Sequence, residues 1–513
     1  MPVLDGKERS LINAVREFIR PTKKTRQGFA RRLNRMPFLA PFIVWASILA
    51  NAAYIVYPNI NIKETLITLL FGWLLIGATA LVGIFFTCTN TIFNSFSICM
   101  FTLLFSYFNM LEAKFIKWLS NSILDAMARA IPAIILIFFI AGAFIYFFNR
   151  YLQKLKNINS VLNIAATTAF AVPVFQLFIN YQFVKKTDHN QSANKHEINQ
   201  NVLKKPDILF VILDAYTSPE SIKKYYGYNN DMFVHWLKKQ GFFVVPDAKT
   251  AHTATPKCIQ SVLNIAELNY ADFPDDNFQS NMALKALNNS IVPNILKYHG
   301  YEIINLSFLK INEFENYYSY DAYYQGVNDY IIRNSMIGFL RKQFVKSDIG
   351  LINMEIFKKI SDISSSKRNY PVFVYGHLMM PHPPYLFDRN GNRHEKEVHP
   401  LRGYLEQYIY TTTLIYNTTK SILSNNTNLV FIIQGDHGSR IIQNEQNQID
   451  EAHSILNALY LPGSDPSWFW EGMRPVDTFR LIFNKYFGAN YPYLSKTNQS
   501  STAEAQHSTA ADK

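Results

Sequence analysis

Residues 208–214 read Ile-Leu-Phe-Val-Ile-Leu-Asp, so six large apolar residues in a row end at an acid. A similar run at 430–438, Val-Phe-Ile-Ile-Gln-Gly-Asp-His-Gly, ends at an Asp-His pair. Short runs rich in β-branched and aromatic residues predict strands. The sequence therefore predicts two strands, far apart in the chain, that each end at polar residues.

The chain around these strands alternates between β-rich runs and amphipathic stretches. Further strands are predicted at 242–245, 301–306 and 372–375, and helices at 218–226, 230–240, 260–263 and 401–423. Alternation of this kind predicts an α/β domain with a mostly parallel central sheet flanked by helices. We expect this domain to occupy residues 206–492.

Polar residues stand at the ends of three of the predicted strands. Asp214, His377 and the pair Asp436 and His437 all fall at the carboxyl end of a strand. Because ligands of parallel sheets gather beyond that end, these side chains are expected to converge. An acid and an Asp-His pair are suitable ligands for one metal ion. Each motif alone is an ordinary turn, but their joint occurrence favours a metal site.

A hydroxyl stands at a predicted helix start. Residues 252–258 read His-Thr-Ala-Thr-Pro-Lys-Cys, and Thr255 followed by Pro256 is a favoured N-cap pair. A hydroxyl there faces unpaired N–H groups and the positive end of the helix dipole, which suits a phosphate or sulfate anion. A bound dication would lower the pKa of this hydroxyl and make it a nucleophile. The alternatives are a plain helix cap at Thr255 and a thiolate nucleophile at Cys258.

The charge distribution indicates a membrane partner and no nucleic acid. Residues 1–36 hold ten Lys and Arg against three acids, and so supply more than half of the formal net charge of +12. A basic tail directly before an apolar span follows the positive-inside rule and suits anionic lipid. We therefore expect a cytoplasmic tail at 1–36.

Five stretches are long and apolar enough to cross a bilayer of roughly 30 Å. They are 38–57, 65–87, 91–110, 130–149 and 160–182, and together they predict a transmembrane domain of about five helices over 37–183. No signal-peptidase site follows the first span. An odd number of spans places everything after residue 183 outside the cytoplasm. The segment 111–129 reads as an amphipathic helix at the outer interface, and the topology would invert if it crossed instead.

The remaining segments are polar. Residues 184–205 predict a solvated linker, and residues 493–513 a disordered tail. Cys258 is the only cysteine after residue 183, so no intramolecular disulfide can form there. A retained anchor followed by a disulfide-free outer domain suits a bacterial inner membrane, with that domain in the periplasm or at the cell surface.

The order of the motifs resembles the sulfatase-like branch of the alkaline phosphatase superfamily. These motifs are the strand before Asp214, Thr255 before a helix, Met380-Pro-His382-Pro-Pro, and Gly-Asp-His-Gly. The resemblance covers about residues 206–490. The membrane half resembles, by architecture alone, the lipoteichoic acid synthases and the phosphoethanolamine transferases of lipid A. The resemblance implies an alkaline-phosphatase-like sheet domain with one divalent metal ion, zinc or manganese.

The resemblance also assigns roles to individual residues. The metal would be held by Asp214, Thr255, Asp436 and His437. Thr255 would be the nucleophile, and His382 would bind the transferred group and act as general acid or base. His377 is a weaker candidate for substrate binding, and a structural role beneath the site is equally open. Lys257 and Arg440 flank the motifs, and they either pair with phosphate oxygens or are ordinary surface charges.

Departures from the family pattern exclude some activities. Formylglycine sulfatases need Cys or Ser, then Pro and Arg at alternate positions, whereas this chain has Cys258-Ile-Gln-Ser-Val. Those sulfatases also carry two adjacent acids after the first strand, whereas this chain has Asp214-Ala215. No full second metal set is found, as alkaline phosphatases proper would need. Sulfate ester hydrolysis by the formylglycine route is therefore not expected.

The resemblance implies a transferase that works by double displacement. Thr255 would attack a membrane phospholipid and release diacylglycerol, and a hydroxyl of an extracytoplasmic glycan or lipid would then resolve the phospho-threonine. Phosphoethanolamine and phosphoglycerol both fit as head groups. The main alternative is a membrane-anchored phosphatase or phosphodiesterase that uses water at the same site. A non-catalytic scaffold and a transporter are weaker alternatives.

Overall fold

The computed structural model describes residues 38–87, 91–119, 158–188 and 205–496, without 271–272, 321 and 345–347, and with the additional residues 36, 142–143, 146 and 150–151. The chain divides into two compact units. The helical unit comprises residues 1–191 and 324–346, and the sheet unit comprises residues 192–323 and 347–513. The predictions for residues 1–35, for the span at 130–149 and for the linker at 189–204 fall almost entirely outside the described residues.

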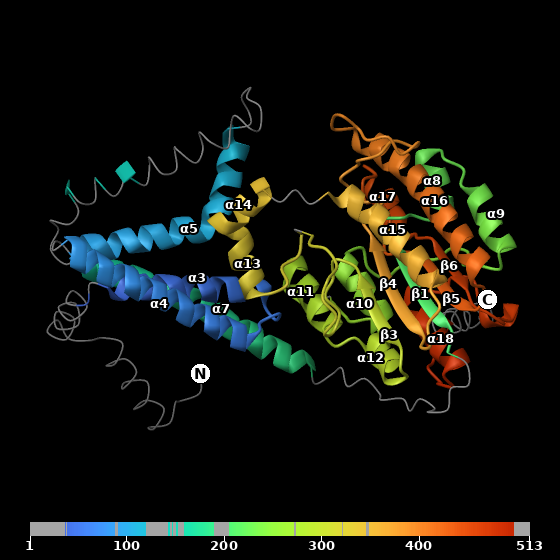
Figure 1. Cartoon of the computed structure of the whole chain (residues 1–513), viewed down its shortest axis with the longest axis horizontal. Coiled ribbons are helices and arrows are strands. Elements are labelled where there is room, and N and C mark those ends of the chain that lie inside the picture. The colour runs from blue at the N-terminus through green and yellow to red at the C-terminus, as the bar shows by residue number, and fades with distance from the viewer. Residues whose placement is uncertain are drawn as a thin grey trace, which may run out of the picture. The chain divides into compact units, whose positions relative to one another are not determined.

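In the described part of the sheet unit, six strands form one sheet in the order β2-β6-β5-β1-β4-β3 (Figure 1). They are β1 (Asp207–Leu213), β2 (Phe243–Val244), β3 (Glu302–Leu306), β4 (Val372–Leu378), β5 (Leu429–Gly435) and β6 (Asn457–Tyr460). β5, β1, β4 and β3 pair in parallel, whereas β6 runs antiparallel to β5 and β2. The sheet is therefore mixed, and the predicted parallel arrangement forms its centre.

Helices cover both faces of this sheet. They are α8 (Pro219–Tyr226), α9 (Asp231–Lys239), α10 (Thr255–Leu263), α11 (Asp276–Leu287), α12 (Ile291–Tyr298), α15 (Ile349–Ser365), α16 (Pro400–Asn425), α17 (Glu445–His453) and α18 (Thr478–Tyr486), with short 3-10 turns at Pro466–Trp468 and Pro475–Asp477. Ile360 of α15 lies 2.6 Å from where a Cβ on Gly376 would be, while Phe373 contacts Phe479 of α18 on the other face. β4 and β5 are consequently buried along their whole length, as expected for strands with both faces covered.

The strand register brings three strand ends together. Leu213 at the end of β1 lies opposite both Leu378 of β4 and Gly435 of β5. The residues that follow these strands therefore emerge at one edge of the sheet, which is where ligands of parallel sheets bind.

The sheet unit differs from the sequence prediction in several elements, since the helices α11, α12, α15, α17 and α18 and the strand β6 were not predicted. β6 was not predicted, because Asn-Ala-Leu-Tyr lacks the β-branched residues that mark strands. The helix predicted at 260–263 begins five residues earlier, at Thr255, with Ala254 as its N-cap. Thr255 is therefore the first helical residue and not the cap.

The helical unit contains α3 (Leu39–Val56), α4 (Ile62–Thr87), α5 (Thr91–Leu119), α7 (Ile158–Asp188), α13 (Val327–Asn334) and α14 (Met336–Phe344). Among the described residues, three helical stretches are long and apolar enough to cross a membrane: 39–56, 62–81 and 159–182. α5 adds a shorter apolar stretch, Ser95–Leu111. Three of the five predicted spans thus coincide with membrane-length helices in the described part of the chain. The span predicted at 91–110 corresponds to the shorter stretch of α5, and the span at 130–149 lies almost entirely outside the described residues. α5 also continues unbroken through residues 111–119, where a separate interfacial helix was expected to begin.

The predicted domain at 206–492 is interrupted by residues 324–346, which pack within the helical unit. Val327, Tyr330 and Ile331 of α13 are buried in one cluster with Ile48 and Ala52 of α3. Their spacing places them on one face of a helix, and that face is buried against apolar helices instead of against the sheet.

The polar linker and the polar tail both begin later in the chain than the sequence predicted. Residues 184–188, assigned to the linker, continue α7. Residues 493–496, assigned to the tail, are ordered, because the backbone N–H groups of Leu494 and Ser495 donate to the carboxylate of Asp477 at 2.8 and 2.9 Å. Residues 497–513 lie outside the described part of the chain.

Candidate active site

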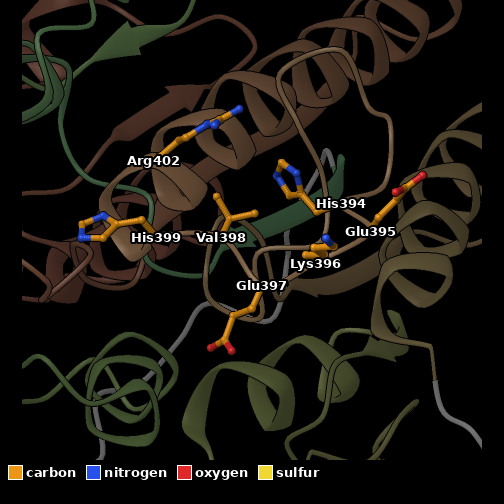
Figure 2. Close-up of a pocket in the computed structure, with 7 residues that line it drawn as sticks. All are labelled: His394, Glu395, Lys396, Glu397, Val398, His399 and Arg402. Carbon is orange, nitrogen blue, oxygen red and sulfur yellow. The ribbon is translucent and has the colours of Figure 1, made fainter. Parts of the chain in front are cut away.

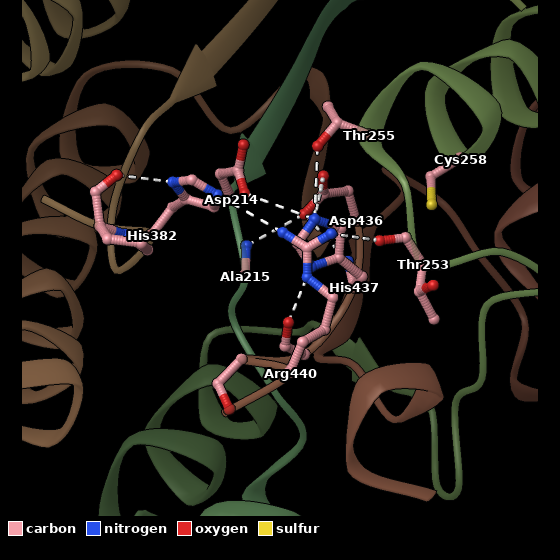
Figure 3. Close-up of polar contacts among 12 residues, drawn as sticks. Asp214, Ala215, Thr253, Thr255, Cys258, His382, Asp436, His437 and Arg440 are labelled. Atoms are coloured by element: carbon pink, nitrogen blue, oxygen red, sulfur yellow. Dashed lines mark hydrogen bonds and ion pairs between the residues drawn. The ribbon is translucent and has the colours of Figure 1, made fainter. Parts of the chain in front are cut away.

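Asp214, Asp436 and His437 form a buried cluster at the carboxyl edge of the sheet (Figure 3). One ligand atom from each lies within 4.8 Å of the others. Nε2 of His437 is 3.6 Å from Oδ1 of Asp214 and 3.4 Å from Oδ2 of Asp436. The structure therefore brings together residues that are more than 220 positions apart in the chain, as the sequence predicted.

Each carboxylate in this cluster uses one oxygen for support and leaves the other free. Oδ1 of Asp436 accepts from the backbone N–H of Ala215 at 3.0 Å and of His437 at 2.9 Å. Oδ2 of Asp214 accepts from Nε2 of His377 at 3.1 Å. Within the described residues, no group donates to Oδ1 of Asp214 or Oδ2 of Asp436, although both atoms are buried. A buried carboxylate oxygen without a donor is costly unless a cation satisfies it.

The imidazole of His437 also uses one ring nitrogen for a supporting hydrogen bond and directs the other toward the cluster. Its Nδ1 lies 2.7 Å from the carbonyl oxygen of Gly438, which can only accept, so Nδ1 carries the proton. Nε2 is then a bare acceptor that faces the two free carboxylate oxygens. Burial, together with the charge of Arg440, lowers the pKa of His437, which keeps the ring in the neutral form that binds metal.

The Thr255 hydroxyl completes the cluster. Its Oγ1 lies 3.3 Å from Nε2 of His437, at the first residue of the buried helix α10. Two tetrahedral ligands of an ion with bonds of ~2.1 Å lie about 3.4 Å apart, which agrees with the separations of 3.3–3.6 Å measured here. The donor set of two carboxylates, one imidazole and one hydroxyl therefore fits a single divalent metal ion.

The glycines of the Gly-Asp-His-Gly loop allow neighbouring backbone to approach. A Cβ on Gly435 would lie 2.2 Å from the carbonyl oxygen of Tyr216, and a Cβ on Gly438 would lie 2.1 Å from that of Glu451. Any side chain at these positions would push the loop away from its supports. The two glycines thus fix where Asp436 and His437 stand.

Arg440 reaches across the open side of the cluster, as Figure 3 shows. Nη1 donates to the carbonyl oxygen of Thr253 at 2.8 Å, and Nη2 lies 3.5 Å from Nε2 of His382. The backbone of Arg440 is held in turn by Glu451, which is fully buried and accepts from the N–H groups of Ser439 at 2.7 Å and Arg440 at 3.0 Å. A guanidinium in this position can bind the oxygens of a phosphoryl group.

His382 lies on the loop after β4 and is partly exposed. Its Nδ1 is 2.6 Å from the carbonyl oxygen of Pro383, so Nε2 is the nitrogen that faces Arg440. The backbone N–H of His382 donates to the carbonyl oxygen of Asp214 at 3.1 Å, and the ring of His382 lies 6.4 Å from that of His437. This is a suitable position for a group that exchanges a proton with the substrate.

A buried amide on α16 holds the His382 loop in place. Nε2 of Gln407 lies 3.3, 2.9 and 3.3 Å from the carbonyl oxygens of Pro381, His382 and Pro384. Its Oε1 accepts from the backbone N–H groups of Leu386 at 2.7 Å and Phe387 at 3.3 Å. The sequence analysis did not identify this residue; the only signal was a long polar side chain between tyrosines in a helix.

Of the two roles left open for His377, the structure favours structural support over substrate binding. Its side chain is fully buried, Nε2 donates to Asp214, and Nδ1 accepts from the hydroxyl of Tyr375 at 2.7 Å. Phe308 packs against the ring with centroids 4.9 Å apart. His377 therefore supports the carboxylate of Asp214 from beneath, with its own side chain enclosed in the protein.

Lys257 and Cys258 also lie apart from the reacting atoms. Nζ of Lys257 pairs with Asp276 at 3.3 Å and contacts Gln279, both on α11, so its charge is directed away from the cluster. The thiol of Cys258 is buried and donates to the carbonyl oxygen of His252 at 3.1 Å. Burial raises the pKa of this thiol far above its usual range, which excludes the thiolate alternative.

A hollow of about 490 Å³ lies beside the loop 394–402 (Figure 2). Its charged side chains point in different directions and share no common centre. The inner acid, Glu406, is already paired with His394 at 3.3 Å and with Arg402 at 3.0 Å. This hollow is an open surface feature and does not form a second ligand set.

Comparisons with known proteins identify one matching family. The sequence model of the family described as Sulfatase matches residues 206–497, more than half of the chain. No curated protein is significantly similar in sequence.

Several solved structures show a similarity to the chain at low identity. The lipoteichoic acid synthase LtaP from Listeria monocytogenes is 12% identical over 56% of this chain and 75% of its own, with a TM-score of 0.38. The C-terminal periplasmic domain of EcEptC from Escherichia coli, in complex with zinc, is 15% identical over 58% of this chain and 87% of its own, with a TM-score of 0.38. A protein in the alkaline phosphatase superfamily from Vibrio parahaemolyticus is 12% identical over 56% and 69%, with a TM-score of 0.37.

Proposed function

The chain belongs to the sulfatase family, and from that membership we propose that it is a metal-dependent transferase. It moves a phospho-head-group, phosphoethanolamine or phosphoglycerol, from a membrane phospholipid to a hydroxyl of an extracytoplasmic glycan or lipid. The observation that carries the proposal is the Thr255 hydroxyl, 3.3 Å from Nε2 of His437 and beside two carboxylates with free oxygens. A threonine in this place is a nucleophile that needs no formylglycine modification.

Four side chains would hold the divalent ion: Asp214, Asp436, His437 and Thr255. When bound, the ion supplies a lower pKa for the threonine hydroxyl and offsets negative charge on the phosphoryl group. The positive end of α10 adds to this effect, because Thr255 is the first residue of that helix.

The reaction would proceed in two displacements. In the first, the ionised oxygen of Thr255 bonds to phosphorus, and the bond from phosphorus to the glycerol oxygen of the lipid breaks. Protonated His382 gives its proton to that oxygen, so diacylglycerol leaves and a phosphodiester remains on Thr255. Arg440 binds the non-bridging phosphoryl oxygens throughout.

In the second displacement, the acceptor hydroxyl attacks the same phosphorus. Neutral His382 takes the proton of that hydroxyl as the new bond forms, and the oxygen of Thr255 leaves in the ionised state in which it began. The pair of steps returns both residues to their starting forms, so the cycle can repeat.

We propose further that the enzyme resides in a bacterial cell membrane, with about five spans, the basic tail in the cytoplasm and the sheet unit outside. The three membrane-length helices support an anchored location. An anchor beside the bilayer suits a lipid donor, which cannot readily leave the membrane.

The test uses the full chain in lipid nanodiscs loaded with zinc or manganese and a phospholipid whose head group is isotopically labelled. With an alcohol acceptor, the expected product is the head-group phosphodiester of that alcohol, and mass spectrometry should find the labelled group on the Thr255 peptide. Thr255→Ala should abolish both signals. Thr253→Ala, two residues away, is the matched control, because Arg440 contacts only its backbone carbonyl.

Release of the free head-group phosphate at a rate independent of the alcohol would instead identify a hydrolase. Product formation by Thr255→Ala at the wild-type rate would refute the nucleophile assignment.

A further inference from the structure

An apolar cavity of about 730 Å³ lies within the helical unit, between α4, α5 and the α13–α14 segment. Aromatic and aliphatic side chains form most of its wall, among them Phe71, Leu75, Phe101, Phe105, Ile331 and Ile332. The volume falls within the ~300–1,000 Å³ typical of ligand sites. Two of the three walls are α4, which contains one of the membrane-length stretches, and α5, which contains the shorter apolar stretch.

Small residues and one indole form part of the cavity wall. Gly72 and Thr102 line it, and the indole of Trp45 packs over the backbone of Gly72, 2.0 Å from where an ideal Cβ would stand. Phe71 and Phe101 stand at the rim with about 60% of their surfaces exposed. The result is a concave apolar surface, unlike the convex face that an ordinary membrane helix presents to lipid.

Hydroxyls line the cavity along its length, but those of Thr79, Thr102 and Ser335 donate to carbonyl oxygens of their own helices. Among the described residues, the only amide side chain that lines the cavity is that of Asn328 in the first turn of α13, and its Oδ1 accepts from Oγ1 of Thr68 on α4 at 2.7 Å. Thr79 lies toward the other end, eleven residues further along α4, which corresponds to ~16 Å of helix. This length is about half of a hydrocarbon core of roughly 30 Å, the depth of one leaflet. An elongated apolar molecule with one polar end matches this shape.

We propose that the cavity binds one acyl chain of the phospholipid donor, with the glycerol end of the lipid at Thr68 and Asn328. The inference rests on the proposed function for the identity of the lipid as donor. Binding one chain in a fixed site holds the head group near the enzyme for longer than free lateral diffusion would allow, which lowers the entropic cost of positioning the reacting phosphorus.

The experiment is photo-crosslinking of the full chain in nanodiscs that contain a trace of phosphatidylethanolamine or phosphatidylglycerol with a diazirine near the middle of one acyl chain. Peptide mapping should find the crosslinks concentrated on Phe71, Leu75 and Phe101. Leu70 and Leu74 lie on the same helix, are 61% and 68% exposed and do not line the cavity. They should be labelled at least ten-fold less. Equal labelling of both sets would overturn the proposal.

Filling the cavity gives a second readout. Thr102→Trp should reduce crosslinking at Phe71 and Leu75 at least ten-fold, while Leu74→Trp, which adds the same side chain outside the cavity, should leave it unchanged. If Thr102→Trp does not give a monodisperse protein, Thr79→Phe replaces it. Unchanged labelling in a folded, filled variant would also overturn the proposal.

Two further arms separate the possible failures. A diazirine fatty acid that labels the same positions and is not displaced by unlabelled phospholipid would assign the cavity to a free acyl ligand and overturn the donor assignment. Thr255→Ala should be labelled as strongly as the wild type, because binding needs no chemistry. Cavity labelling without head-group transfer by the wild type would refute the proposed function alone, whereas transfer without selective labelling would refute only the cavity.

Discussion

Nε2 of His377 donates to Oδ2 of Asp214 at 3.1 Å, and this single contact explains how the first metal ligand is oriented. Because the contact occupies Oδ2, it is Oδ1 of Asp214 that faces His437. The Tyr375 hydroxyl fixes the tautomer of His377 from the other side. Supporting hydrogen bonds of this kind set the geometry of many metal sites.

Replacing His377 with Phe should weaken metal binding about 10–100-fold, because Asp214 loses its supporting donor while the ring volume is kept. The measurement is a competition titration of zinc or manganese against a chelator, with the full chain in detergent. Tyr375→Phe removes only the more distant hydroxyl and should have a smaller effect. Wild-type metal affinity in a folded His377→Phe protein would contradict the supporting role.

Replacing Gln407 with Leu should lower kcat/KM about 100-fold, since His382 would no longer be held in place. Up to five backbone groups of the His382 loop lose their partner, at a cost of the order of 1–3 kcal/mol in unfolding free energy. Steady-state kinetics and metal content should be measured together, and metal content should not change. Thr413→Ala, on the exposed side of the same helix, is the control and should resemble the wild type.

Replacing Glu451 with Gln should raise the KM for the donor about ten-fold and leave metal content unchanged. A glutamine carbonyl can still accept from one of the two N–H groups that Glu451 binds, but its amide cannot accept from the other, so the Arg440 backbone loses a partner. Asp450→Asn removes a neighbouring exposed charge and serves as the control. Metal loss as large as in Asp436→Asn would show that Glu451 acts through His437 instead.

His252 should make the sheet unit sensitive to mild acid. Burial, with a further contribution from the charge of Lys257, lowers the pKa of His252 from 6.5 to about 4. Between these values the unfolded chain binds more protons than the folded one, so stability is fully present above pH 6.5 and falls as the pH is lowered toward 4.

The check is the thermal unfolding midpoint between pH 7 and 4. His252→Phe keeps a ring against Tyr270, whose centroid lies 5.0 Å away, and should lose less stability over this window than the wild type. His235→Gln changes an exposed histidine and should follow the wild-type curve. Identical curves for all three proteins would show that His252 does not cause the loss of stability in mild acid.

Much of the sheet could be predicted from the sequence, because the patterns that mark its strands involve residues close together in the chain. β1 and β5 are uninterrupted apolar runs, and such runs form buried strands wherever they occur in a globular domain. β6 escaped prediction because its four residues are poor strand formers, and it is held only by pairing with β5 and β2. The packing of segment 324–346 in the helical unit was not predicted, because an apolar helix face does not show which surface will bury it.

The sequence by itself determined the α/β class and singled out Asp214, Thr255, Asp436 and His437 as candidates, since each follows a recognisable strand or starts a helix. Only the tertiary structure separated the flanking candidates: Arg440 faces the cluster, His377 lies beneath it, and Lys257 turns away. The support from Gln407 and Glu451 also appeared only there. The physical reason is that a buried side chain's direction depends on hydrogen-bond partners far away in the chain, whereas strand and helix patterns depend on near neighbours.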